Sequence, residues 1–112
     1  MDVFFRSGKL KKECEDFRLL VKRHGDQRAQ RIRRRLGELK AARTLEDMRT
    51  LPQARCHELR QNRAGQISVD LDHPYRLILE PAHDPVPRKP DGGLDWNAIT
   101  CIRILDIEDT HE

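Results

Sequence analysis

The chain has 112 residues, a formal net charge of +3 and 37% charged but only 4% aromatic residues. This length fits one domain, 1–112, and excludes a multidomain enzyme. The charge is uneven, because residues 9–49 carry 14 Lys and Arg against 7 Asp and Glu, whereas residues 81–112 carry 3 against 7. A basic half joined to an acidic half fits a surface that meets nucleic acid, and the alternative is a set of arginine-rich helices with solvated outer faces.

Cysteine usage and the absence of long apolar runs predict a cytoplasmic protein without a membrane segment. Cys14, Cys56 and Cys101 are odd in number and form no CxxC pair, so no disulfide framework is expected. The histidines are scattered, and His57 beside Cys56 does not have the spacing of two zinc ligands. We therefore expect neither a metal nor another cofactor.

The first half of the chain predicts a short strand followed by two helices. Val3 to Phe5 is the strand, and apolar residues at helical spacing then run from Leu10 to His24. A second helix begins with Asp26 as its cap and carries an apolar stripe, Ala29, Ile32, Leu36 and Leu39. Arg31 and Arg34 project away from that stripe, while Arg28 and Arg35 flank it, which gives the helical hairpin a basic exterior.

The second half predicts four strands. A short piece from Thr44 to Met48 leads to Leu51-Pro52, which ends any helix. Strands follow near 54–60, 66–72 and 75–80, and a proline- and glycine-rich connection occupies 81–97. The last strand, 99–107, is apolar on both faces at several positions, as expected in the middle of a sheet. The expected fold class is α+β, in the order β-α-α-β-β-β-β.

The stretch from Arg55 to Pro81 is the candidate binding site. Ile67, Val69 and Leu71 alternate with polar residues, which predicts a strand with one buried and one wet face, and His73-Pro74 turns the chain into the next strand. Functional side chains then fall at strand ends and turns, where a rigid sheet can present them to a ligand: Arg60, Arg63, His73 and Arg76. This pattern indicates a small site for a polyanion.

Several motifs in this stretch and beyond it resemble one known family. They are Arg55-x-His57-x-Leu59, Arg63-x-Gly65, Tyr75-Arg76-Leu77-Ile78, the insertion HDPVPRKPDGGLDW and the closing Asp106-Ile107-Glu108-Asp109-Thr110-His111. Together they resemble the RelE/ParE superfamily of bacterial toxins and, within it, the HigB-like plasmid maintenance killer proteins. The resemblance covers nearly the whole chain and implies two helices packed on a twisted, mainly antiparallel sheet.

The resemblance also implies a function and partners. HigB-like toxins are endoribonucleases that cut mRNA on the ribosome without a metal, until a cognate antitoxin neutralises them. The implied partners of this chain are a helix-turn-helix, HigA-like antitoxin, the ribosome and its mRNA, and operator DNA only through the antitoxin complex. No membrane partner is implied.

Metal-free RNA cleavage needs a base for the 2′-hydroxyl, an acid for the leaving oxygen, and cations for the phosphate. By resemblance, His57 and His111 are the base and acid candidates, since imidazole titrates near neutral pH. Arg76 would neutralise the phosphate, and Asp109 would orient His111 or contact a base. The remaining candidates are those expected to bind RNA: Arg55, Arg60, Arg63, Tyr75, Arg31 and Arg34.

Each role has a competing structural explanation. His57 is otherwise a half-buried strand residue, Tyr75 a packing residue, and Arg76 an ion-pair partner of Asp70 or Asp72 across the hairpin. Thr110 stands where the family commonly has tyrosine, and threonine cannot stack on a base. Two alternative functions therefore remain open at this point: a ParE-like inhibitor of DNA gyrase, and a non-catalytic module that binds an antitoxin or DNA.

Overall fold

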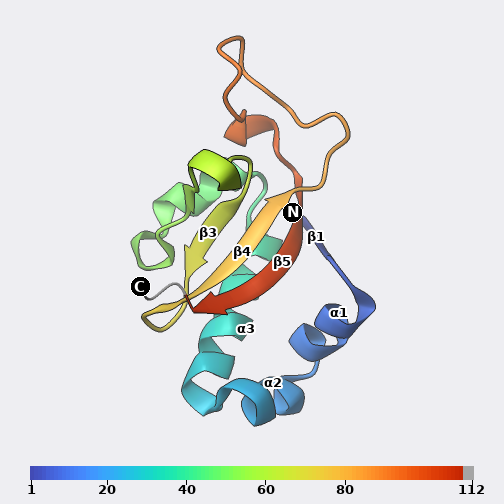
Figure 1. The fold of residues 1–112 in the computed structure, drawn as a ribbon, viewed down its shortest axis with the longest axis vertical. Coiled ribbons are helices and arrows are strands. Elements are labelled where there is room, and N and C mark those ends of the chain that lie inside the picture. Colours follow the sequence, from blue (N-terminus) through green and yellow to red (C-terminus); the bar gives the residue numbers. More distant parts are fainter. Residues whose placement is uncertain (110–112) are drawn as a thin grey trace.

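The computed structural model describes residues 1–109, which form an α+β fold with one five-stranded mixed sheet (Figure 1). The strands are β1 (Asp2–Phe5), β2 (His57–Glu58), β3 (Ile67–Asp70), β4 (Tyr75–Pro81) and β5 (Cys101–Asp109). Their order in the sheet is β1-β5-β4-β3-β2. β1 runs parallel to β5, and the other three pairings are antiparallel. The α+β class and the central position of the last strand are therefore as predicted.

The N-terminal helical region contains two helices, so the prediction of one helix from Leu10 to His24 is wrong. α1 (Gly8–Glu15) ends at Asp16, and α2 (Phe17–His24) begins directly after it. Asp16 has an extended backbone, and its side chain accepts hydrogen bonds from the backbone N–H groups of Arg18 and Leu19 at 3.1 and 3.3 Å. An aspartate that caps a new helix in this way interrupts the old one, although the apolar stripe continues across the break.

α3 (Asp26–Ala41) is the long helix and runs behind the sheet in Figure 1. Gly25, with φ of 82°, is its N-cap, so Asp26 is the first helical residue and not the predicted cap. The predicted stripe Ala29, Ile32, Leu36 and Leu39 is buried. It packs in the same core as the sheet residues that face the helices, among them Leu77, Leu79, Ile102 and Ile104.

One arginine of α3 belongs to this buried layer. Arg35 is 1% exposed. Its Nε donates to the carbonyl of Asp70 at 2.8 Å, one Nη donates to Glu38 at 2.9 Å, and the other donates to the carbonyl of Gln53 at 3.1 Å. Because the guanidinium satisfies two backbone carbonyls and one carboxylate, it joins α3 to the end of β3 and to the segment before β2.

The region between α3 and β3 has less strand than predicted. Two 3-10 helices, η1 (Leu45–Thr50) and η2 (Pro52–Ala54), precede β2, and a third, η3 (Gln61–Arg63), follows it. The expected strand over 54–60 is therefore only two residues long. Arg55 has a left-handed backbone with φ of 41°, which interrupts extended structure just before β2. The turn expected at Gly65 is present, with φ of 91° at the glycine.

The insertion before β5 projects beyond the sheet as a mostly irregular loop, as predicted (Figure 1). Its end carries η4 (Trp96–Ala98). Trp96 is 4% exposed, donates its indole N–H to Glu58 at 2.9 Å and stacks against Arg49. The expectation that Trp96 fixes the end of the loop to the body is thereby confirmed. In the part of the chain described, no helix is both long and apolar enough to cross a membrane.

Candidate functional site

The sheet face away from the helices, called the open face below, carries part of the predicted site, including His57 and Arg76. Strand register places His57 opposite Ser68, Ser68 opposite Ile78, and Ile78 opposite Asp106. The neighbouring row contains Asp70, Arg76 and Glu108. Because side chains of paired residues share a face, the rows bring three strands that are distant in sequence to one surface.

A bulge in β5 decides which of its residues reach the open face. Ile104 lies opposite Leu79, but Ile78 lies opposite Asp106, so Leu105 is an extra residue in the ladder. Without that extra residue, Asp106 would share the buried face of Ile104, because side chains alternate along a strand. The bulge therefore turns Asp106 and Glu108 to the open face.

His57 is held in one orientation by a backbone carbonyl. Its Nδ1 lies 2.7 Å from the carbonyl oxygen of Arg55. A carbonyl oxygen only accepts hydrogen bonds, so Nδ1 carries the proton in neutral His57 and Nε2 keeps its lone pair. The left-handed backbone at Arg55 gives this carbonyl its direction. His57 is therefore prepared to accept a proton at Nε2.

Two predicted arginines share one carboxylate at the end of β3. Asp70 forms ion pairs with Arg55 at 3.3 Å and with Arg76 at 3.7 Å. The ion pair expected as the structural role of Arg76 is thus present. These residues, with His73 and Tyr75, line a small cavity of about 100 Å³ at the β3–β4 turn. Two cations on one carboxylate leave a net positive charge where a phosphate group could bind.

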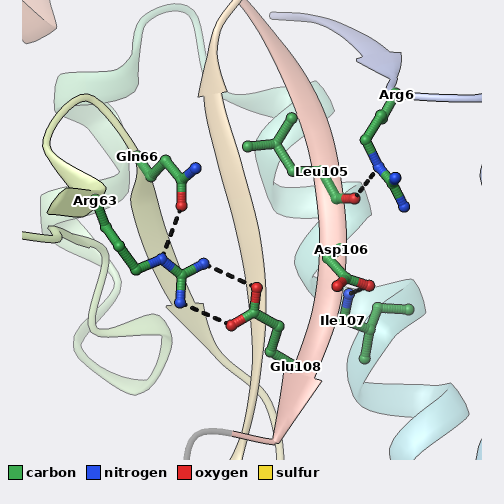
Figure 2. Close-up of polar contacts among 7 residues, drawn as sticks. All are labelled: Arg6, Arg63, Gln66, Leu105, Asp106, Ile107 and Glu108. Carbon is green, nitrogen blue, oxygen red and sulfur yellow. Dashed lines mark hydrogen bonds and ion pairs between the residues drawn. The ribbon is translucent and has the colours of Figure 1, made fainter.

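Arg63 crosses the open face from η3 to β5 (Figure 2). Its two Nη atoms donate to the two carboxylate oxygens of Glu108, both at 2.8 Å, and its Nε donates to Gln66 at 3.0 Å. The hydrogen bond with Glu108 raises the pKa of Arg63, which therefore stays charged. A guanidinium bound on three sides is a rigid plane and not a mobile cation.

A hollow of about 370 Å³ lies next to this arginine. Ile78 and Leu105 are its apolar lining residues. Its polar lining consists of one amide, two arginines and three carboxylates: Gln66, Arg6, Arg63, Glu80, Asp106 and Glu108. A groove of about 210 Å³, to which Arg88 of the insertion contributes, shares Gln66 and Glu80 with the hollow. The hollow and the groove therefore lie next to each other, with Gln66 and Glu80 in the lining of both.

Ser68 departs from the prediction of a wet face on its strand. It is 0% exposed, although Ile67, Val69 and Leu71 on the other side of β3 are buried as expected. Its hydroxyl has no hydrogen-bond partner among residues 1–109. Ser68 is a small residue between two larger side chains on the same face, His57 of β2 and Ile78 of β4, and sequence alternation does not reveal such cross-strand neighbours.

Tyr75 and Asp109 lie on the other side of the sheet. They are paired in register, and Tyr75 alternates with Arg76, so both belong to the face that meets the helices. Arg28 of α3 stacks on the Tyr75 ring at 3.3 Å and pairs with Asp72 at 3.1 Å. Packing, the competing explanation for Tyr75, is the one that its contacts support, and Asp109 is separated from His57 by the sheet.

The remaining candidates are not gathered at the open face. Arg31 and Arg34 lie on α3 and line a shallow depression of about 340 Å³ with two other residues of that helix. Arg60 is exposed at the start of η3. His111, predicted as the acid, lies outside the described residues, as does Thr110.

Compared with models of known protein families and with curated proteins, the chain matches none. Within residues 1–109 there is no group of three or more His, Cys, Asp or Glu side chains arranged to hold a metal ion. The open face holds His57, the arginines Arg76 and Arg63, and the carboxylates that pair with these arginines. These groups offer a proton acceptor, a phosphate-sized positive cavity and a hollow rich in hydrogen-bonding groups.

Four open-face residues were not predicted for the site: Arg6, Asp70, Asp106 and Glu108. Asp70 was expected only as a possible ion-pair partner, and Glu108 and Asp106 were noted only within the closing motif. A partial signal exists in β5, where Ile102, Ile104 and Ile107 break the period of two and so indicate the bulge. Arg6 gives no such signal, because its place depends on the parallel pairing of β1 with β5.

Proposed function

We propose that this protein is an endoribonuclease that cleaves mRNA by attack of the 2′-hydroxyl on the adjacent phosphorus. The observation that carries the proposal is the orientation of His57, whose Nδ1 donates to the Arg55 carbonyl and leaves Nε2 as a proton acceptor. By strand register His57 shares the open face with Arg76, and Arg76 lines a small cavity at the β3–β4 turn together with Arg55. A base and paired guanidinium groups are what phosphodiester cleavage without a metal requires.

In the proposed reaction, Nε2 of His57 takes the proton of the 2′-hydroxyl. The 2′-oxygen forms a bond to phosphorus, and the bond from phosphorus to the 5′-oxygen breaks. Arg55 and Arg76 neutralise the charge that builds on the phosphate oxygens, with Asp70 holding the two guanidinium groups in place. The products are a 2′,3′-cyclic phosphate and a 5′-hydroxyl.

The leaving 5′-oxygen needs a proton, for which we propose His111. Among the candidates on β5, Asp109 alternates to the helix side of the sheet and so does not meet the substrate on the open face. We assign the acid role to His111 from the resemblance to HigB-like toxins, and we assign no catalytic role to Asp109.

By the resemblance to HigB-like toxins, we propose that the substrate is mRNA on the ribosome and that a helix-turn-helix antitoxin neutralises the activity in the cytoplasm. Binding to operator DNA would then occur only through the antitoxin complex. Arg31, which is partly exposed, and Arg34, which is exposed, are available on α3 for contacts with ribosomal RNA, since neither forms an ion pair within the described residues.

The test is to add the purified protein to translating ribosomes and to map the ends of the mRNA. We expect cuts with the natural protein and a loss of about a hundredfold or more with His57→Ala, as for removal of a general base. His24→Gln is the matched control, because His24 lies at the end of α2 and pairs with Glu13 away from the open face. Intact mRNA with the natural protein, or equal cutting by His57→Ala, would refute the proposal.

A second candidate function is a non-catalytic module that binds an antitoxin or DNA. The ion pairs of the open face favour it, since Glu108 binds Arg63 and Asp70 binds both Arg55 and Arg76. If this is the function, expression of the protein without an antitoxin leaves growth and mRNA unchanged. A gyrase inhibitor, the third possibility from the sequence, has no specific observation in its favour.

A further inference from the structure

The carboxylates of the hollow on the open face make it a poor site for phosphate. Glu80, Asp106 and Glu108 line it together with Arg6 and Arg63, and both Nη atoms of Arg63 are already bound to Glu108. A phosphate would meet more negative than positive charge there. The volume of about 370 Å³ falls within the range of small-ligand sites, roughly 300–1,000 Å³. The hollow therefore suits an uncharged group that carries hydrogen-bond donors.

The bound plane of Arg63 is suited to stacking. Three of its five in-plane N–H donors are bound to Gln66 and Glu108, while the side chain remains 35% exposed and lines the hollow (Figure 2). Proteins commonly stack unpaired RNA bases on the planes of arginine guanidinium groups. The three hydrogen bonds already order the Arg63 guanidinium in the absence of RNA. Binding of a base therefore costs little conformational entropy at this side chain.

Arg6 and Asp106 supply the free hydrogen-bonding groups beside that platform. Arg6 Nε donates to the carbonyl of Leu105 at 2.7 Å, which fixes the side chain and leaves its Nη donors for a ligand. Asp106 Oδ1 accepts from the N–H of Ile107 at 2.8 Å, which fixes the carboxylate and leaves Oδ2 and a second lone pair of Oδ1 for the two donors of a ligand. No ion pair joins these two described side chains to each other, so donors and an acceptor stand free at the same hollow.

Guanine is the base whose edge fits this pair. Its pairing edge presents one acceptor, O6, followed by two adjacent donors, N1–H and N2–H₂, which match an arginine followed by a carboxylate. Adenine and cytosine each offer only one donor group on that edge, and uracil would place its O2 acceptor against the carboxylate. A well-formed pair of hydrogen bonds to a base edge discriminates by about 1–3 kcal/mol, which corresponds to roughly 5- to 150-fold in affinity.

We infer that the hollow is a guanine-selective base subsite, in which Arg63 stacks on the base and Arg6 and Asp106 read its edge. This inference rests on the proposed function, because it assigns the part of the RNA that lies beside the cleaved phosphate. Arg63 then binds the base and not the phosphate, while Arg55 and Arg76 bind the phosphate.

The test uses short RNAs with 2′-O-methyl sugars, which cannot be cleaved by attack of the 2′-oxygen. Each is an adenine hexanucleotide with one position changed to guanine, inosine, cytosine or uracil, and binding is measured by fluorescence anisotropy. We expect the guanine RNA to bind about tenfold more tightly than the others, with inosine, which lacks the 2-amino group, in between. Asp106→Asn removes the preference, whereas Asp84→Asn on the exposed insertion retains it.

A second variant tests the stacking role. Arg63→Lys keeps the charge but removes the plane, so it should weaken all the RNAs by a similar factor without changing their order. Equal binding of all RNAs, or an unchanged preference in Asp106→Asn, overturns the inference. The inference is also overturned if oligolysine binds, if this binding is lost in Asp106→Asn, and if the RNAs show no base preference. The hollow would then be a site for a basic protein segment.

The outcome is separable from that of the proposed function, because these RNAs report binding alone. Cleavage of natural RNA without a guanine preference removes the subsite and leaves the ribonuclease. A guanine preference without cleavage of natural RNA keeps the subsite and removes the proposed catalytic role of His57.

Discussion

At the scale of single residues, the arginines of this chain have different roles. Their charge is the same, so charge alone does not tell these roles apart. Arg35 is buried and supports the fold, Arg63 is fixed by Glu108 and Gln66, and Arg55 and Arg76 share Asp70. What separates these roles is the set of partners that each guanidinium has. The proposed site therefore depends on carboxylates as much as on arginines.

Replacing Arg35 by methionine should lower the free energy of unfolding by about 3 kcal/mol, because two backbone carbonyls and Glu38 lose a charged donor. Urea unfolding followed by circular dichroism measures the change. Arg34→Met is the matched control, since Arg34 is exposed on the same helix and should change stability by no more than about 0.5 kcal/mol. Equal effects of the two variants would contradict the structural role of Arg35.

At the scale of elements, two local features shape the site and its support. Asp16 divides the N-terminal helical region into α1 and α2, and the bulge at Leu105 directs Asp106 and Glu108 to the open face. Both features interrupt a regular period, of 3.6 residues in the helix and two in the strand. Both therefore let the chain change direction while its apolar residues stay in the core.

Asp16→Ala should destabilise the protein by about 1 kcal/mol, because the first N–H groups of α2 lose their acceptor. The loss appears as a lower midpoint in urea unfolding with an unchanged slope. Glu15→Ala, one residue earlier and exposed, should have little effect, since its side chain accepts no hydrogen bond within the described residues. An Asp16→Ala variant as stable as Glu15→Ala would show that the cap is unimportant.

At the scale of the whole molecule, the sheet separates two surfaces. The helices and the core occupy one face, with Tyr75 and Arg28 at its margin, while His57, Arg76 and the hollow occupy the other. The basic helical surface and the proposed catalytic groups are therefore on opposite sides of the sheet. A ribosome-bound substrate would meet the open face, and Arg31 and Arg34 would contact a different part of the particle.

The periodic parts of this arrangement could be predicted from the sequence. The apolar stripe of α3, the alternation in β3 and the strand character of β4 and β5 follow from residue spacing alone. The break at Asp16 and the shortness of β2 could not, because each depends on a backbone angle or hydrogen bond at one residue. Strand register puts His57 and Arg76 on one face and Tyr75 and Asp109 on the other, and the sequence alone does not give this register.

The buried thiols give the molecule a characteristic response to alkaline pH. Burial raises the pKa of Cys14 and that of Cys56 from 9.0 to about 12. Their contribution to stability is complete below pH 9 and is lost as the pH rises toward 12, because only the unfolded chain ionises them in that range. We expect the natural protein to lose about 1 kcal/mol per thiol by pH 10, relative to its value at pH 8.

A Cys14→Ala, Cys56→Ala variant isolates this effect, since all other groups titrate alike in the two proteins. Urea unfolding at pH 8 and pH 10 should give a smaller loss of stability for the variant than for the natural protein. Equal losses would mean that the thiols ionise as easily in the folded as in the unfolded chain.

The chemistry of the RNA ends tests the central claim most directly. Attack by the 2′-hydroxyl, with His57 as base, predicts that mRNA cut on the ribosome carries a 5′-hydroxyl on one fragment and a 2′,3′-cyclic phosphate on the other. These ends should disappear in His57→Ala and remain in His24→Gln. Fragments with 5′-phosphate and 3′-hydroxyl ends, or no fragments at all, would contradict the proposed catalytic role of the open face.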